Sequence, residues 1–425
     1  MKRIKTIKTV VDKKMCIGCG ACYVACPTSC IELRYGIRFN YPSIDQERCT
    51  ECGLCVESCP SVYLLKDTTI PNNIYGGMCE SNEHLEIHCT EREIRFNSAS
   101  GGFVTGLILY MMSKGLCDGG LVSCSNSKDA LISDTFIALD RETLLGCRGS
   151  RYTPVSACGA LEEVLERPGR YVFIGTPCNI EGLRNLQSQY KELEERIVLS
   201  LGFICAGMAS RSSTRSFLKR YGADEKEIKK IYYRGNGWPG SFTAYGDNDE
   251  IVLRRPLLTY KNKEVIGDEL FYLVARDHPL RCHNCTDHWA QYADISVSDP
   301  WTPDNLETEN IGNSSIIIRS DKGRQIVREA IDSGFFNVTR KLSINDIYNQ
   351  QQNVVQNSER AAGSCIPLYQ LFFLKRIPDI FSIIRYKGSG LKVTLRSWLN
   401  RNYYNSPKYI HVKNNRKHKQ AKSNA

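Results

Sequence analysis

The sequence lacks the long apolar segments that mark membrane-spanning and secreted proteins. It never holds the roughly 18 consecutive apolar residues that a spanning helix needs, and its longest apolar helical candidate, Phe103 to Met112, is far shorter. The basic N-terminus, Met1 to Lys14, has no apolar signal-peptide core. We therefore expect a cytoplasmic protein.

Acidic residues are nearly missing from the C-terminal segment. From Lys375 to the end, 13 Lys and Arg residues stand against the single acid Asp379, so this segment carries a formal charge of +12. The whole chain carries +10, which leaves −2 for everything before the segment. The basic character therefore belongs to the tail alone.

Cysteine, by contrast, is abundant. The chain has 20 cysteines among 425 residues, and nine of them lie between Cys16 and Cys59. A reducing cytoplasm keeps thiols free, which excludes a disulfide framework and leaves metal ligation or redox chemistry. The remaining composition, 42% hydrophobic and 24% charged, is that of a globular protein and excludes wholesale disorder.

Two cysteine runs share one spacing, C-x2-C-x2-C-x3-C-P, and resemble the two-cluster bacterial ferredoxins. In such runs three cysteines hold one 4Fe-4S cluster and the fourth reaches the other cluster. Structural zinc is the alternative, but zinc prefers two pairs of ligands per ion. We expect one cluster on Cys16, Cys19, Cys22 and Cys59, and the other on Cys49, Cys52, Cys55 and Cys26.

The region from Asn97 to about Asp299 alternates short strands with helices, which is typical of an α/β layer with a largely parallel sheet. The expected strands are Gly120–Cys124, Tyr171–Gly175 and Ile197–Leu201. The expected helices are Arg141–Gly146, Asn179–Gln189 and Ser212–Tyr221.

A turn of small residues, Ser98 to Gly102, precedes a further apolar helix. We expect Ser98 or Ser100 to cap this helix and Gly115 to end it. Free backbone amides at such a helix start suit a phosphate or pyrophosphate, although most capped helices bind nothing.

Later cysteines are candidate ligands of a third metal centre. Cys178 opens a helix directly after a strand, where the positive helix end is expected to lower the pKa of its thiol. A small buried residue is the alternative for this position. Cys178, Cys205, Cys282 and Cys285 could hold a cluster, and Cys282 and Cys285 with His283 or His288 could instead hold zinc.

Six short motifs follow one another along the main body. They are Asn97-Ser-Ala-Ser-Gly-Gly102, Gly149-Ser-Arg-Tyr152, Gly175-Thr-Pro-Cys178, Gly202-Phe-Ile-Cys205, Gly237-Trp-Pro-Gly240, and Cys282-x2-Cys285 with Ala293 to Trp301. In this order they resemble the coenzyme F420 hydrogenase/dehydrogenase beta-subunit family. The resemblance implies an α+β ferredoxin-like domain at 1–70, a larger α/β flavin-binding catalytic domain at 71–345, and a basic helical or disordered tail at 346–425.

The resemblance also implies cofactors and site residues, because the family carries a flavin, usually FAD, beside iron-sulfur clusters. Arg151, where the family often has Lys, is the candidate catalytic residue. The implied phosphate-binding residues are Ser98, Ser100, Gly101, Gly102 and Thr105. The implied cleft is lined by Gly149, Ser150, Tyr152, Gly175, Thr176 and Pro177. Cys178, Cys205, Cys282 and Cys285 would ligate a third 4Fe-4S cluster.

Several polar and aromatic residues near the cysteine pair are given structural roles. Asp287, Asp294 and Asp299 are expected to satisfy backbone donors or cations such as Arg276 and Arg281, with ligand orientation or proton delivery as the alternative. Trp238 and Trp301 are expected to pack against the core, with stacking on a ring system as the alternative.

The tail has three sections. Residues Tyr348 to Ser358 are interpreted as a linker, Ile366 to Ile384 as apolar helices, and Lys387 to Ala425 as a solvated, disordered end. Attachment to an anionic membrane surface is an alternative for the tail. Nucleic acid is a weaker one, based on Tyr403, Tyr404 and Tyr409 among the basic residues.

These features together predict an iron-sulfur flavoprotein oxidoreductase. Electrons from ferredoxin or a similar donor would pass through the clusters to FAD and on to an organic two-electron acceptor. The resemblance suggests a role in surface polysaccharide synthesis. The alternatives are an oxidoreductase of coenzyme F420, a deazaflavin, and an electron-transfer subunit that feeds a partner enzyme.

Overall fold

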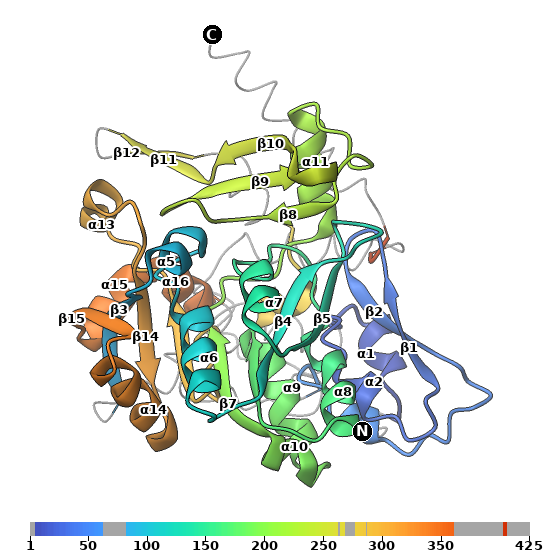
Figure 1. The fold of residues 1–425 in the computed structure, drawn as a ribbon. Coiled ribbons are helices and arrows are strands. Elements are labelled where there is room, and N and C mark those ends of the chain that lie inside the picture. Colours follow the sequence, from blue (N-terminus) through green and yellow to red (C-terminus); the bar gives the residue numbers. More distant parts are fainter. Residues whose placement is uncertain are drawn as a thin grey trace.

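The computed structural model describes residues 5–62, 82–261, 264–267, 277–285, 287–360 and 403–405 (Figure 1). These residues form an N-terminal unit, a large sheet with helices on both faces, and a smaller antiparallel sheet. None of the helices in these ranges is long and apolar enough to cross a membrane.

The N-terminal unit is built from short elements around its cysteines. They are the helices α1 (Lys8–Asp12), α2 (Ala21–Val24) and α3 (Leu54–Glu57) and the antiparallel strands β1 (Ile31–Tyr35) and β2 (Asn40–Ile44). Gly20 and Gly53 precede α2 and α3 with φ angles of 93° and 89°. Only glycine adopts this conformation without strain, which explains a glycine after Cys19 and after Cys52.

The main body is organised by an eight-stranded sheet. Its strands are β3 (Glu83–Cys89), β4 (Gly119–Ser125), β5 (Ser133–Ala138), β6 (Tyr171–Gly175), β7 (Ile197–Phe203), β13 (Ile295–Ser298), β14 (Ser314–Ile318) and β15 (Phe336–Lys341). They lie in the order β15-β3-β14-β13-β7-β6-β4-β5. The three predicted strands are confirmed within one or two residues.

The prediction of a largely parallel sheet is wrong, because only the pairings β13·β7, β7·β6 and β6·β4 are parallel. The strand β5 pairs antiparallel with β4, and β14, β3 and β15 add antiparallel pairings on the other side. The four parallel strands all end on one side of the sheet, which we call the carboxyl edge. In open α/β sheets this edge is where ligands bind.

Helices cover both faces of the sheet (Figure 1). One face carries α5 (Arg92–Asn97), α6 (Phe103–Ser113), α7 (Arg141–Gly146) and α14 (Asp321–Asp332). The other carries α8 (Leu161–Glu166), α9 (Pro177–Gln187), α10 (Lys191–Arg196) and the 3-10 turn Ala157–Ala160. Val172 and Phe173 of β6 belong to these two different cores, as the two-residue period of a strand requires.

The smaller sheet lies above the carboxyl edge in Figure 1 and has the order β10-β9-β8. Its strands are β8 (Lys230–Tyr232), β9 (Ser241–Tyr245) and β10 (Ile251–Pro256), and a hairpin of β11 (Leu258–Lys261) and β12 (Glu264–Gly267) extends beside it. The helix α11 (Arg211–Arg220) packs on this sheet through Phe217 and Phe242. With α7, α9 and α11, the three predicted helices are confirmed, with ends shifted by two residues or fewer.

The predicted cap of α6 is wrong. Gly102, with a φ of 77°, is the N-cap residue, and Ser98 instead closes α5. The predicted end is confirmed, because Gly115 has a φ of 64° and its N–H donates to the Met112 carbonyl at 3.0 Å. The chain needs glycine at the start because it reverses there directly after α5.

The C-terminal part of the main body is helical where the sequence suggests a linker. Residues 344–360 form α15 (Ile344–Gln350) and α16 (Gln352–Arg360), following the helix α13 (Pro303–Thr308) and the strand β15. Ile347 and Val354 pack against Trp289 and Ile317, so the linker prediction is wrong because these apolar residues cover a buried face. The segment Ile366 to Ile384 and Tyr409 lie outside the described residues.

Three tail residues, Tyr403 to Asn405, lie against the N-terminal unit. The Tyr403 ring is 2% exposed and lies 5.7 Å from the Phe39 ring, centroid to centroid. The N–H of Arg38 donates to the Tyr404 carbonyl at 2.8 Å. The expectation of a wholly solvated end is therefore wrong at these residues, and the Tyr403 ring is not available to stack on a base.

Candidate functional site

The N-terminal cysteines gather into two groups. Burial, and then the neighbouring Cys19, Cys16, Cys59 and, last, Cys55, raise the pKa of the Cys22 thiol well above its usual value. Burial, with Cys52, Cys49 and Cys26 as neighbours, likewise raises the pKa of the Cys55 thiol. Apart from the contact of Cys22 with Cys55, the neighbours in each group are those that the ferredoxin rule assigns to one cluster. We call them the inner group (Cys16, Cys19, Cys22 and Cys59) and the outer group (Cys26, Cys49, Cys52 and Cys55).

The two groups differ in their exposure. Cys16, Cys19 and Cys22 are buried, whereas Cys52 is exposed and Cys49 partly exposed. A cavity lined by all four cysteines of the outer group opens beside Lys5 and Glu51. Cys30, which also lines this cavity, is 3% exposed and its sulfur lies 3.4 Å from the Cys26 sulfur.

The later cysteines form a third group beneath the carboxyl edge. Burial, followed by Cys205, and then by Cys282 and Cys285, raises the pKa of the Cys178 thiol well above its usual value. The expectation that the helix start lowers this pKa is wrong, because burial outweighs the helix end. Burial also raises the pKa of Cys205 to about 12. We call Cys178, Cys205, Cys282 and Cys285 the edge group.

The chemistry of the three groups fits iron-sulfur clusters. Thiols with a raised pKa, such as Cys22, Cys55 and Cys178, become thiolates when a positive metal centre compensates their charge. Four thiolates per site is the donor set of a 4Fe-4S cluster. Within the described ranges, no three His, Cys, Asp or Glu side chains are close enough to hold a single metal ion. The Nδ1 atom of His288 lies 2.7 Å from the Cys205 carbonyl oxygen.

Cys158 lies beside Cys19 of the inner group and beside Asn179, the residue after Cys178 of the edge group, and no sequence pattern predicted this. Its thiol donates to the Asn179 carbonyl at 3.3 Å, its side chain lowers the pKa of the Cys19 thiol, and its N–H donates to the Cys19 carbonyl at 2.9 Å. A Cβ atom on Gly182 would lie 3.0 Å from the Cys158 sulfur and 4.0 Å from the Cys19 sulfur. Cys158 belongs to no spaced motif, so only the packing of its 3-10 turn reveals it.

The N-terminal unit is fastened to the main body around this link. A Cβ atom on Gly20 would lie 2.6 Å from the Gly159 nitrogen, so the two backbones touch. Ser156 donates from Oγ to the Gly18 carbonyl at 2.7 Å and accepts from the Asn40 side chain at 2.8 Å. The cysteine groups on the two sides therefore keep a fixed relative position.

In the predicted phosphate-binding turn, most of the hydrogen-bond donors already bond to other parts of the protein. Ser100 donates to the Asn313 carbonyl, and the Gly101 N–H donates to the Ser314 hydroxyl at 3.0 Å. A Cβ atom on Gly101 would lie 2.6 Å from the Ser314 nitrogen. The turn therefore fits a phosphate less well than its sequence suggests, although the Ser98 hydroxyl is buried without a partner and Thr105 lies in the first turn of α6.

The predicted cleft residues lie along the carboxyl edge. Thr176 is the N-cap of α9, its N–H donates to the Asn179 side chain at 3.1 Å, and its hydroxyl lies 3.2 Å from the Cys178 sulfur. Gly175 ends β6 and Pro177 begins α9. Gly149, with a φ of 93°, packs against the Arg234 carbonyl, and the Tyr152 ring lies 5.8 Å from the Tyr233 ring. Ser150 is partly exposed between them.

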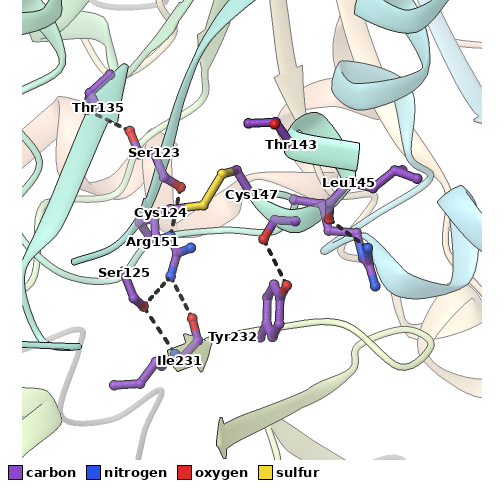
Figure 2. The surroundings of a disulfide bond; sticks show 12 residues. Ser123, Cys124, Ser125, Thr135, Thr143, Leu145, Cys147, Arg151, Ile231 and Tyr232 are labelled. Atoms are coloured by element: carbon purple, nitrogen blue, oxygen red, sulfur yellow. Dashed lines mark hydrogen bonds between the residues drawn. A yellow bond between two sulfur atoms is a disulfide. The ribbon is translucent and has the colours of Figure 1, made fainter. Parts of the chain in front are cut away.

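Arg151, the candidate catalytic residue, holds neighbouring segments together. Its Nε donates to the Ser123 carbonyl at 3.1 Å, and its Nη1 donates to the Ile231 carbonyl at 2.6 Å and to the Ser125 hydroxyl at 3.2 Å (Figure 2). Its Nη2 atom is buried without a partner. A Lys side chain has one nitrogen and cannot make the same set of contacts.

Arg234 and Asp299 form a second cluster of side chains, and no single sequence motif contains both residues. The guanidinium donates to both carboxylate oxygens at 2.7 and 2.8 Å, and the Trp238 indole donates to Asp299 at 2.8 Å. The Trp238 and Trp301 rings lie 5.0 Å apart. The structural role expected for Asp299 is confirmed.

The other two carboxylates also have structural partners. Asp294 accepts from the Ser200 N–H at 2.8 Å and pairs with Lys322 at 3.3 Å. Asp287 accepts from the Trp289 N–H at 2.9 Å. Arg276 lies outside the described residues.

Comparisons with known protein families agree with the two parts of this structure. Two models of the coenzyme F420 hydrogenase/dehydrogenase beta-subunit family match the main body. The model of the N-terminal part of that subunit matches residues 85–162, and the model of its C-terminal part matches residues 169–342. Residues 9–65 match "4Fe-4S dicluster domain". The N-terminal unit is therefore an iron-sulfur domain.

Several characterised proteins are similar to the chain. The beta subunit of the coenzyme F420 hydrogenase of Methanococcus voltae is 24% identical over 65% of this chain and 94% of its own length. One subunit of the F(420)H(2) dehydrogenase of Methanosarcina mazei is 23% identical over 75% of this chain and 83% of its own length. A chain of the F420-reducing [NiFe] hydrogenase complex of Methanosarcina barkeri matches with a TM-score of 0.48 at 20% identity, over 65% of this chain and 90% of that chain.

Proposed function

Because the chain belongs to the coenzyme F420 hydrogenase/dehydrogenase beta-subunit family, we propose that it is an iron-sulfur oxidoreductase that exchanges electrons with coenzyme F420. The observation that carries the proposal is that three cysteine groups follow one another in space, from the exposed Cys52 to the carboxyl edge. A bound 4Fe-4S cluster accepts and releases one electron at a time.

The position of each cysteine group suggests a separate role in electron transfer. The outer group, with its exposed Cys52, lies where an external electron partner can approach. Three of the four inner cysteines are buried, and the group is held against the main body by the backbone contact of Gly20 with Gly159. Cys158 is fully buried and contacts both Cys19 of the inner group and Asn179 beside Cys178, so it bridges the inner and edge groups.

The comparisons favour the deazaflavin alternative over the flavoprotein expected first. The relatives are named for coenzyme F420, and none of these findings supports a role in surface polysaccharide synthesis. A bound FAD and a ferredoxin donor stay predictions. The Ser100 hydroxyl and the Gly101 N–H already donate hydrogen bonds within the protein, so they give FAD no added support. We propose the edge group as the ligands of a third cluster.

The test combines metal analysis with turnover. Anaerobically purified protein should hold about 12 iron per chain and should reduce a viologen dye when given reduced coenzyme F420. Cys178→Ser should lose about a third of the iron and most of this activity. The control, Cys117→Ser, changes a buried cysteine of the sheet core and should keep both.

Two results would contradict parts of this proposal. About eight iron with one zinc per chain would make the edge group a structural zinc site. Full iron content without any oxidation of reduced coenzyme F420 would exclude the deazaflavin reaction. The chain would then be an electron-transfer subunit, a second candidate that the exposed outer group favours, and it should co-purify with a partner enzyme.

A further inference from the structure

Cys124 and Cys147 form a disulfide bond with a Cα–Cα distance of 5.0 Å (Figure 2). The sulfur atoms join the strand β4 to the C-terminal end of α7, 23 positions later in the chain. Neither residue belongs to a cysteine group or to a spaced motif, and neither was predicted to have a function. Their bond is therefore a feature that the proposed electron path does not explain.

The surroundings of this bond argue against a structural staple. The other cysteines of the described ranges are free thiols, including all twelve residues of the three groups. Cluster ligation requires those twelve to stay reduced. A disulfide that exists in a protein kept under such conditions is usually a catalytic or redox-sensing bond rather than a framework.

The position of the bond connects it to the electron path. Cys124 lies at the carboxyl edge, one residue before the end of β4. The next strand, β6, leads into Cys178, and the strand after it, β7, leads into Cys205. The bridge and the edge group therefore occupy the ends of neighbouring parallel strands.

The bridge also anchors the loop that carries Arg151. Cys147 is two residues before Gly149, and Arg151 reaches back to the carbonyl of Ser123, which precedes Cys124 (Figure 2). Opening the bridge would release one of the ties between this loop and β4. The oxidation state of the pair therefore affects how firmly the predicted cofactor cleft is held.

Cys124 is partly exposed, Cys147 is buried, and an open cavity lies beside the pair. Gly146 and Arg148, the neighbours of Cys147, line an open cavity together with Arg141, Lys230 and Tyr232, and with the acids Glu93 and Glu142. The Tyr232 hydroxyl donates to the Gly146 carbonyl at 2.8 Å, and the Arg148 Nε atom is buried without a partner. A reductant can therefore approach the bond from the partly exposed Cys124.

We propose that Cys124 and Cys147 are a redox-active pair that accepts two electrons at the carboxyl edge. The inference rests on the proposed function, because reduced coenzyme F420 is the reductant. A reduced deazaflavin gives up a hydride and a proton, the S–S bond breaks, and two S–H bonds form. The coenzyme is oxidised and the cystine becomes two thiols, so atoms and electrons balance.

The test is sequential thiol labelling of the full-length protein under anaerobic conditions. Protein is denatured in iodoacetamide, then treated with dithiothreitol and N-ethylmaleimide, and the label on each cysteine is read by mass spectrometry. We expect Cys124 and Cys147 to carry N-ethylmaleimide as isolated and iodoacetamide after incubation with reduced coenzyme F420. Cys117 should carry iodoacetamide in both samples.

A stoichiometric measurement provides a second readout. Without another acceptor, wild-type protein should oxidise one more equivalent of reduced coenzyme F420 than C124S/C147S, at equal iron content. Iodoacetamide on both cysteines before any reductant is added would overturn the inference, as would equal consumption by the two proteins. Reduction of viologen in the same preparation tests the proposed function separately. A closed bridge beside active viologen reduction overturns this inference alone, whereas absent viologen reduction overturns the proposed function and this inference with it.

Discussion

Arg234 joins two loops that lie 65 positions apart in the sequence. Its side chain is 1% exposed and makes a bidentate pair with Asp299, whose side chain is 16% exposed. Removing one partner of a buried ion pair leaves the other charge uncompensated in a poorly solvated place. Loss of either Arg234 or Asp299 alone is therefore expected to lower the stability of the protein.

Arg234→Met should lower the free energy of unfolding by about 3 kcal/mol, measured by chemical denaturation at constant iron content. The matched control is Arg141→Met, which breaks the exposed pair of Arg141 with Glu91. That change should cost less than about 1 kcal/mol. Equal losses in the two variants would show that burial of the Arg234 pair does not matter for stability.

At the scale of elements, α2 and α3 begin in the same way but meet different surroundings. Gly20 and Gly53 have nearly the same φ. A Cβ atom on Gly20 would press on the Gly159 backbone, whereas a Cβ atom on Gly53 would meet nothing within 4 Å. The helix start at Gly20 is therefore also the interface between the N-terminal unit and the main body.

Gly53→Ala should cost about 1 kcal/mol, because only the backbone conformation is strained. Gly20→Ala should cost about 1 to 3 kcal/mol more, because the backbones of Gly20 and Gly159 must move apart. Denaturation of the two variants, together with hydrogen exchange at residues 156–160, measures the difference. A similar cost for both substitutions would contradict the close contact.

The elements also show what sequence reasoning can reach. The short apolar runs of β4, β6 and β7 and the spacing of the N-terminal cysteines are local signals, and local signals predicted these strands and grouped these cysteines. The outer strands β3, β14 and β15 were not predicted, since their pairing depends on segments more than 200 positions apart. Cys158 and Arg234 were missed for the same reason, because only tertiary packing gives them partners.

At the scale of the whole molecule, residues Tyr403 to Asn405 of the tail meet the N-terminal unit. The Arg38 side chain donates to the Tyr403 carbonyl at 2.8 Å across 365 positions, and Asn405 accepts from the Ile37 N–H at 3.1 Å. The Tyr403 ring covers Phe39. Tail residues therefore complete the surface of the unit that holds the inner and outer groups.

Tyr403→Ala should lower the stability of the N-terminal unit by about 3 kcal/mol, because it empties a buried aromatic site. Hydrogen exchange at residues 31–44 should accelerate, and iron should be lost faster in air. Tyr35→Ala, at a position that is 48% exposed on the same unit, is the control and should change little. Unchanged exchange in Tyr403→Ala would contradict a stabilising tail.

This contact between the tail and the N-terminal unit has a consequence for biosynthesis. Tyr403 leaves the ribosome hundreds of residues after Arg38, and N-terminal domains begin to fold during translation. The N-terminal cysteines are thus made early, while the aromatic cover over their unit is made 365 positions after Arg38. Iron and sulfide can be inserted throughout that interval, and docking of the tail then closes the finished unit.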